Sequence, residues 1–198
     1  MRGRVSALAV CLATATCTIA PLPQGGVGAG LDPLPPPGFG TLRQEDVSMT
    51  LASGDLQLMV TPLEASVTRV TAPDTELRLS GLVGLHGAPG SDGTGLFLVS
   101  FYSEQPDVPF APEEVQLISR GQRTRPQNII PVTPSWGTRR VGQRQTQLAV
   151  YDFGDSIDLE SSLLLIYQFD ESTQWGQILP RIQAERARAR ARAGVETR

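Results

Sequence analysis

The sequence predicts an all-β fold, a two-layer antiparallel β-sandwich of about 7–8 strands with a short C-terminal helix or tail. Sixteen prolines and twenty glycines among 198 residues exceed average usage and indicate many turns. Between these turns, short apolar or alternating segments recur from residue 46 to residue 169. No convincing helical pattern separates these segments, which excludes repeated βαβ units and favours a sandwich.

Eight segments have the length and patterning of strands. They are 46–53, 56–60, 75–82, 95–102, 115–118, 128–132, 146–153 and 162–169. Gly54-Asp55 between the first two predicts a hairpin. In the third, Leu77 and Leu79 alternate with polar residues, which predicts a strand with one solvated face. The fourth is apolar on both faces, as expected for a central strand.

The C-terminal segment 178–194 is rich in helix formers, with Pro180 suited to a first turn and Gly194 to a stop. Arginines alternate with alanines from Arg186 to Arg192, so on a helix they would turn about 200° per step and divide between two sides. We expect a solvated tail, with contact to anionic lipid or nucleic acid as the alternative.

The N-terminus has the features of a secretory signal. Arg2 and Arg4 precede an uncharged stretch, residues 5–20, that is too short and too rich in Thr and Ala for a stable membrane span. A buried N-terminal helix is the alternative. Small residues in Val27-Gly28-Ala29 suit cleavage, which would leave a soluble exported protein, either secreted or periplasmic.

Cys17 offers a second outcome for the same segment. Thr14-Ala15-Thr16-Cys17 resembles a bacterial lipobox, whose cysteine is diacylated and becomes the first mature residue. The Pro/Gly-rich sequence behind it suits a tether between a lipid and a domain. This reading implies a periplasmic or cell-surface lipoprotein, attached by lipid alone and without a transmembrane helix in its mature form.

The expected organisation follows from these segments. It is a signal peptide at 1–29 (or 1–16 if Cys17 is lipidated), a flexible Pro/Gly-rich linker at 30–44, a sandwich domain at 45–172 and a helix or Arg-rich tail at 173–198. No cysteine lies beyond residue 17, so the domain contains no disulfide. Its architecture resembles the Ig-like Greek-key domains of exported bacterial proteins, folds that host adhesion, substrate-binding and scaffold roles.

Composition narrows the possible chemistry. The net charge of −3 gives no global field that favours nucleic acid as a partner. All seventeen basic residues are arginine, so Schiff-base and general-base chemistry of lysine is excluded. With one histidine and no domain cysteine, a zinc site is not expected. We expect no cofactor.

Two short motifs suggest catalysis only superficially. Gly154-Asp155-Ser156 resembles the nucleophile block of GDSL-type hydrolases, but no histidine follows it, so we interpret it as a turn. His86 begins a glycine-rich stretch that predicts a mobile loop between strands, where a catalytic or metal-binding histidine would lack a fixed partner.

Acidic residues crowd the connection between the last two expected strands. Asp152, Asp155, Asp158 and Glu160 supply the hard oxygen ligands that calcium requires. Their spacing does not match an EF-hand loop, and solvated acidic turns are the alternative. They are therefore a weak calcium candidate.

The stretch 115–151 is rich in arginine and contains no acidic residue. Its arginines are Arg120, Arg123, Arg125, Arg139, Arg140 and Arg144. On one face they would form an anion-binding patch for an envelope polymer or a protein partner, with Trp136 as a flat apolar anchor. Alternatively, they point outward and pair with the acids of 104–114 and 152–160.

Together these observations predict an exported, non-enzymatic binding or scaffold module of the cell envelope, because no nucleophile, base and orienting group occur as a set. One alternative is a carboxylate-based glycoside hydrolase. Its acids would come from Glu113, Glu114, Asp152, Asp155 and Asp158. Another is a structural lipoprotein or pilus-like subunit with an unpaired edge strand.

Overall fold

A computed structural model describes residues 33–87 and 90–196 of the chain. The chain divides after Pro33, and the unit that begins at Leu34 is the one described below. The expected signal segment, Cys17 and the beginning of the expected linker lie outside the described residues.

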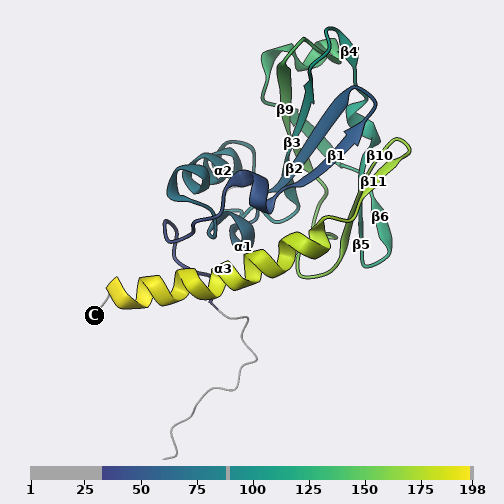
Figure 1. The fold of residues 1–198 in the computed structure, drawn as a ribbon. Helices are drawn as coiled ribbons and strands as arrows, with labels where there is room; N and C mark the ends of the chain where they lie inside the picture. The colour runs from purple at the N-terminus through teal and green to yellow at the C-terminus, as the bar shows by residue number, and fades with distance from the viewer. Residues whose placement is uncertain (1–32, 88–89, 197–198) are drawn as a thin grey trace, which may run out of the picture. The chain divides into compact units, whose positions relative to one another are not determined.

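Five strands form the larger sheet, which is antiparallel throughout (Figure 1). In sheet order they are β1 (Met49–Ser53), β2 (Leu56–Pro62), β3 (Leu96–Ser103), β9 (Gln145–Asp152) and β7 (Asn128–Pro131). The predicted hairpin at Gly54-Asp55 is confirmed, because β1 and β2 pair directly and Gly54 takes a φ of 56°. The strand predicted to be central, β3, lies in the middle of this sheet with β2 on one side and β9 on the other.

A second antiparallel sheet contains four strands, two of five residues and two of three. In order they are β11 (Asp170–Ser172), β10 (Leu163–Tyr167), β5 (Val115–Ser119) and β6 (Gln122–Thr124). A separate two-stranded ladder pairs β4 (Val108–Pro109) with β8 (Arg140–Val141). Short 3₁₀ turns complete the connections, namely η1 (Gln44–Val47), η2 (Pro112–Glu114) and η3 (Pro134–Thr138).

The two sheets share one apolar core. Buried leucines and valines of β1, β2 and β3 belong to the same cluster as those of β5 and β10. Aromatic rings fill part of it, with Phe101 packed against Phe110 and Tyr167 at centroid distances of 4.7 and 5.6 Å. Antiparallel sheets around a common core are consistent with the predicted sandwich, while the Ig-like Greek key stays a prediction.

The strand predicted at 75–82 is wrong, because this segment lies within the helix α2 (Pro73–His86). A short helix, α1 (Ala65–Thr68), precedes it, so two helices separate β2 from β3 where the sequence suggested none. The mobile loop expected at His86 is also corrected, since this residue ends α2.

The physical reason lies in two competing patterns. Leu77 and Leu79 fit a two-residue repeat, but Leu79 and Val83 fit a helical repeat of four, and only this second pair is buried. Leu77 is 72% exposed. Helix-start signals support the second pattern, because Pro73 begins α2 and Asp74 follows in its first turn.

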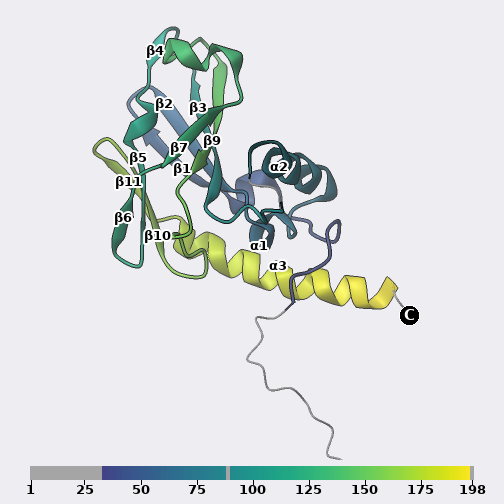
Figure 2. The same cartoon turned by 180° about the vertical axis from the view of Figure 1, so that it is seen from behind.

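The C-terminal helix α3 (Trp175–Glu196) is longer than predicted and packs against the sheets and α1 (Figures 1 and 2). Trp175, Ile178 and Ile182 are buried along one stripe of it. Pro180 lies inside the helix instead of in its first turn, and this residue is exposed to solvent. Within the part of the chain described here, no helix is long and apolar enough to span a bilayer.

The solvated tail predicted for the Ala-Arg repeat is therefore corrected. Arg186 donates from Nε to the carbonyl of Ser66 at 2.9 Å, and Arg192 donates to the carbonyl of Phe39 at 2.6 Å. Glu185, the residue before Arg186, is only 2% exposed and accepts hydrogen bonds from Arg192 and from Thr41. The arginines do divide between two sides, but each side contacts a different segment of the domain.

Candidate functional site

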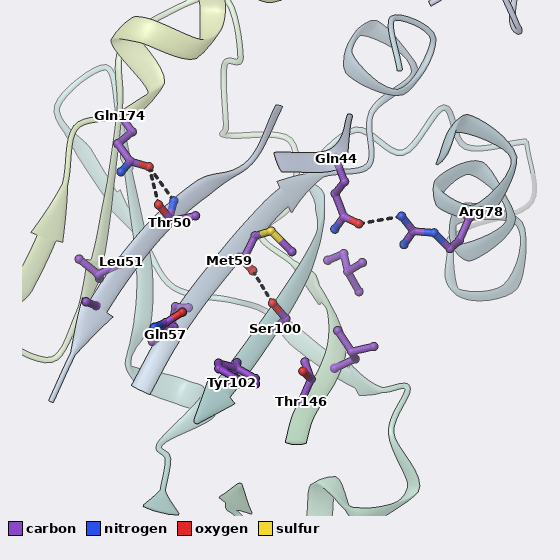
Figure 3. Close-up of a pocket in the computed structure, with 14 residues that line it drawn as sticks. Gln44, Thr50, Leu51, Gln57, Met59, Arg78, Ser100, Tyr102, Thr146 and Gln174 are labelled. Carbon is purple, nitrogen blue, oxygen red and sulfur yellow. Dashed lines mark hydrogen bonds between the residues drawn. The ribbon is translucent and has the colours of Figure 1, made fainter. Parts of the chain in front are cut away.

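A groove of about 750 Å³ lies on the outer face of the five-stranded sheet. The neighbouring part of that face is covered by α2, whose Leu79 and Val83 form a second apolar cluster with Leu63, Leu96 and Leu98. The groove occupies the part of this face beyond α2, and Figure 3 draws the residues that line it.

The floor of the groove consists of two rows of side chains that run across the strands. The pairing register aligns Thr50, Met59, Ser100 and Leu148 in one row and Ala52, Gln57, Tyr102 and Thr146 in the next. Successive residues of a strand point to opposite faces, so these positions share the face that points away from the core. The floor therefore mixes apolar side chains such as Met59, Tyr102 and Leu148 with polar ones such as Gln57, Ser100 and Thr146.

Two amide side chains frame the groove, both from residues outside the sheet. Gln44 of η1 accepts a hydrogen bond at Oε1 from the guanidinium of Arg78 on α2, at 2.7 Å. On the side of β1, Oε1 of Gln174 accepts from both the N–H and the hydroxyl of Thr50, at 2.8 and 2.9 Å. Figure 3 shows these two pairs on opposite sides of the strands.

A closed ring of hydrogen bonds fixes Gln44. The side-chain Nε2 of Gln44 donates to the hydroxyl of Thr61 at 2.9 Å. The hydroxyl of Ser48 donates to the main-chain carbonyl of Gln44 at 2.6 Å. Because the Ser48 proton is used there, the 2.7 Å contact between the two hydroxyls has Thr61 as its donor. Ser48 and Thr61 are both buried, so the ring holds the Gln44 amide rigidly beside Arg78.

Among the described residues, Arg78 is the only charged one that lines the groove. No carboxylate among the described residues lies within ion-pair distance of it. Its one hydrogen bond, to Gln44, uses one of the five N–H donors of a guanidinium. The groove thus carries a positive charge at one end and no negative charge.

The predicted arginine patch is distributed differently. Three of its six members form ion pairs, as the alternative interpretation expected. The pairs are Arg120 with Asp158, Arg139 with Glu113 and Arg140 with Asp107. The hydrogen bond from Arg140 also lowers the pKa of Asp107 below its ordinary value. Arg123, Arg125 and Arg144 make no ion pair with any described residue, and an anion-binding role for them stays a prediction.

Trp136 is not an exposed anchor. It is 7% exposed and packs against Phe101 and Phe110 at ring-centroid distances of 5.9 and 5.0 Å. Tyr151 lies beside it, and burial raises the pKa of this phenol well above its ordinary value. The indole belongs to the core and presents no flat surface to a ligand.

The acidic connection after β9 does not converge on one point. The Oδ1 of Asp152 accepts from the N–H of Gly154 at 2.8 Å, whereas Asp158 binds Arg120 and Glu160 binds Arg186. Burial alone would raise the pKa of Asp158, but the N–H of Glu160 and the Arg120 guanidinium outweigh it and lower this pKa. Across the described residues, no group of three or more acidic, His or Cys side chains is placed to hold a metal ion.

The acids considered for glycoside hydrolysis also lie apart from the groove, since none of them lines it. Of these, Glu113 is paired with Arg139, and Glu114 and Asp155 are exposed. Ser156 of the Gly-Asp-Ser turn contacts the hydroxyl of Thr124 at 3.4 Å. Hydrolase activity therefore stays a prediction that this groove does not support.

Sheet edges bear on the pilus-like alternative. The edge strand β1 has its Thr50 N–H occupied by Gln174, and the opposite edge strand β7 is short and contains Pro131. Proline and short length are the usual means of blunting an edge. Addition of a strand from another chain at these two edges stays a prediction. The described edge strands β1 and β7 are only five and four residues long.

Sequence reasoning missed the groove residues Gln57, Arg78, Tyr102, Thr146 and Gln174. One signal was available, because the central strand is apolar on both faces and so requires cover on its outer side. That signal implies a covering element but not which segment supplies it. The strand expected at 75–82 placed Arg78 in a sheet. The covering element is instead the helix α2, which contains this residue.

Comparison with protein-family models, with curated proteins and with solved structures finds no significant match to this chain. The groove and its role must therefore be argued from the geometry of the site.

Proposed function

We propose that this chain is an exported, non-enzymatic binding module of a bacterial envelope that takes its ligand in the groove on the outer sheet face. The observation that carries the proposal is the groove itself. It has about 750 Å³ of volume, a floor of mixed apolar and polar side chains, and a few fixed polar groups at its rim. Binding sites for organic ligands commonly combine these properties.

Rigid scaffolding supports a binding role. Four adjacent strands and a closed hydrogen-bond ring hold the floor and Gln44 in place, so little conformational entropy is lost when a ligand enters. None of the described residues that line the groove is a histidine, a cysteine or a carboxylate, the usual acid-base and nucleophilic groups. Recognition is thus the chemistry that its side chains support.

The Ig-like Greek key and export belong to the same proposal. Strands far apart in sequence, such as β3 and β9, are direct neighbours in an antiparallel sheet, as in Greek-key folds. Export rests on the charged and apolar pattern of residues 1–20. The mass of the mature N-terminus tests it, because lipidation leaves Cys17 first and ordinary cleavage leaves a residue near Gly30.

Methyl NMR tests the binding role directly. Met59 lines the groove, whereas Met49 is fully buried in the core on the other face of the sheet. The protein is labelled with ¹³C at its methionine methyl groups. A detergent-free organic extract of the native envelope is then expected to shift the Met59 resonance and leave that of Met49 in place. Extract that moves neither resonance, or both equally, would contradict a ligand-binding groove.

A further inference from the structure

We infer that the ligand of this groove is an amphipathic organic acid. Its carboxylate would lie at Arg78 and its acyl chain or ring would lie along Met59, Leu98 and Leu148. This inference rests on the proposed binding function and names the chemical class of the ligand. It is carried by the juxtaposition of one guanidinium, which has no ion-pair partner among the described residues, with the apolar side chains of the floor.

Charge at the rim selects an anion. The Arg78 guanidinium has N–H donors left after its hydrogen bond to Gln44, and no acid of the described residues neutralises it. A carboxylate accepts two parallel hydrogen bonds from such a planar fork. A cationic ligand would meet like charge at this end with no compensating acid in the lining.

The held orientation of Gln44 strengthens this selection. Its Nε2 is committed to Thr61, so its Oε1 is the atom presented toward Arg78. The amide therefore orients the guanidinium without cancelling its charge. A carboxylate would find a cation that Gln44 already holds at the groove.

The floor selects an apolar body. Met59, Leu148 and Tyr102 are partly exposed at neighbouring positions on β2, β9 and β3. Leu98 lies on the same face of β3, two residues before Ser100, and is buried with Leu79 and Val83 of α2. Covering apolar surface of this kind contributes about 25 cal/mol per Å². Polar side chains lie beside them at Gln57 and Thr146, and the hydroxyl of Ser100 is directed to the Met59 carbonyl.

The position on a sheet face disfavours an extended peptide, which usually binds at an edge through main-chain hydrogen bonds. Main-chain groups of β2 and β3 are already paired with their neighbours. A neutral glycan is also disfavoured, because Tyr102 is the one aromatic side chain in the lining and is only partly exposed.

The test compares three probes on the ¹³C-methyl protein. Decanoate carries both features, 1-decanol has the same chain without the charge, and cellotetraose is a neutral glycan. Below its micellar concentration, decanoate is expected to shift Met59 but not Met49 and to bind about tenfold more tightly than 1-decanol, as one charge-assisted hydrogen-bonded contact provides.

Two variants and their controls locate the contacts. Arg78→Gln should remove the preference for decanoate over 1-decanol, while Arg181→Gln on the exposed side of α3 should keep it. Ala52→Trp, which fills the groove, should abolish binding of both probes. Ala184→Trp on the outer side of α3 should not, and circular dichroism verifies that all four variants are folded.

Each other outcome overturns the inference. Equal affinity for decanoate and 1-decanol, or an acid preference that survives in Arg78→Gln, would remove the role of the guanidinium. A Met59 shift with cellotetraose but not with decanoate would refute the acid and leave the binding function standing. If neither the probes nor the envelope extract shifts Met59, the proposed function fails as well.

Discussion

Gln44 and Arg78 are joined by a hydrogen bond of 2.7 Å although they are 34 positions apart in the sequence. The contact joins η1, at the entrance to the five-stranded sheet, to α2, which covers part of that sheet's outer face. The same amide donates to the buried hydroxyl of Thr61. One side chain thereby positions the only charge of the groove and satisfies a buried polar group.

Replacement of this amide has a predictable cost. Gln44→Ala removes the partner of Arg78 and leaves the Thr61 hydroxyl with one partner fewer, so the free energy of unfolding should fall by about 1–2 kcal/mol. Urea denaturation measures this. Gln122→Ala, at an exposed position on β6, is the control and should change stability by less than about 0.5 kcal/mol.

Leu77 and Leu79 distinguish the helix from the strand that the sequence suggested. On a strand both would lie on one face, but on α2 Leu79 is fully buried and Leu77 is 72% exposed. Leu79→Ala should therefore destabilise the fold by about 2–5 kcal/mol, and Leu77→Ala by less than about 0.5 kcal/mol. Similar losses for both variants in urea denaturation would contradict a helix at this position.

Glu185 makes the attachment of α3 sensitive to acid. Burial alone would raise its pKa, but hydrogen bonds from Thr41 and Arg192 outweigh burial and hold the pKa below the ordinary value of 4.5. The folded state therefore binds this proton more weakly than the unfolded state. The stabilisation is present above pH 4.5 and is lost as the pH falls through the lowered value.

Urea denaturation between pH 3 and pH 7 measures the effect, with those limits chosen about the ordinary carboxyl pKa. Glu185→Gln should lower stability at pH 7 by about 1.5–3 kcal/mol, because charge-assisted hydrogen bonds are lost, and should flatten the acid dependence. Glu171→Gln, at an exposed position on β11, is the control and should leave the profile unchanged. A profile for Glu185→Gln as steep as that of the parent would refute the assignment.

Glu64, before α1, should behave in the opposite sense. Partial burial raises its pKa and outweighs the hydrogen bond from Ser66, and the carboxylate of Asp92 adds to the rise. The stabilisation that protonated Glu64 gives the folded state is therefore complete below pH 4.5 and is lost as the pH rises through the raised pKa. Glu64→Gln should gain stability relative to the parent between pH 4 and pH 7, by less than about 1 kcal/mol because solvent screens the partly exposed side chain.

Denaturation curves at both ends of that range provide the measurement. Asp92→Asn is an informative companion, because it removes the neighbouring charge that contributes to the rise. It should reduce the pH dependence that Glu64 causes without abolishing it. A relative stability of Glu64→Gln that stays constant or falls with rising pH would contradict the raised pKa.

Local patterning was sufficient for most of the larger strands. The hairpin of β1 and β2 follows from Gly54-Asp55 between alternating segments, and the central place of β3 follows from its two apolar faces. Strands of two or three residues, such as β4 and β8, carry too few positions for a repeat to be recognised. Their pairing depends on which segments the larger sheets bring together.

Long-range packing decided the remainder. The residues around Leu79 are compatible with either a strand or a helix. The helix forms because it lets Leu79 and Val83 pack together against the outer face of the sheet. Likewise the Ala-Arg repeat of α3 predicted a solvated tail. In the structure Arg186 and Arg192 donate hydrogen bonds to carbonyls more than a hundred residues away in the sequence. No local window of sequence contains these partners.

The sequence by itself determined a chain built mainly of antiparallel strands, with a helix-forming C-terminal segment and a pattern typical of export at residues 1–20. Only the tertiary structure decided where a ligand would bind. The groove gathers Gln44, Gln57, Arg78, Thr146 and Gln174 from five separate segments. Strand register and the position of α2 bring these side chains onto one face, and both follow from burial of apolar surface between distant residues.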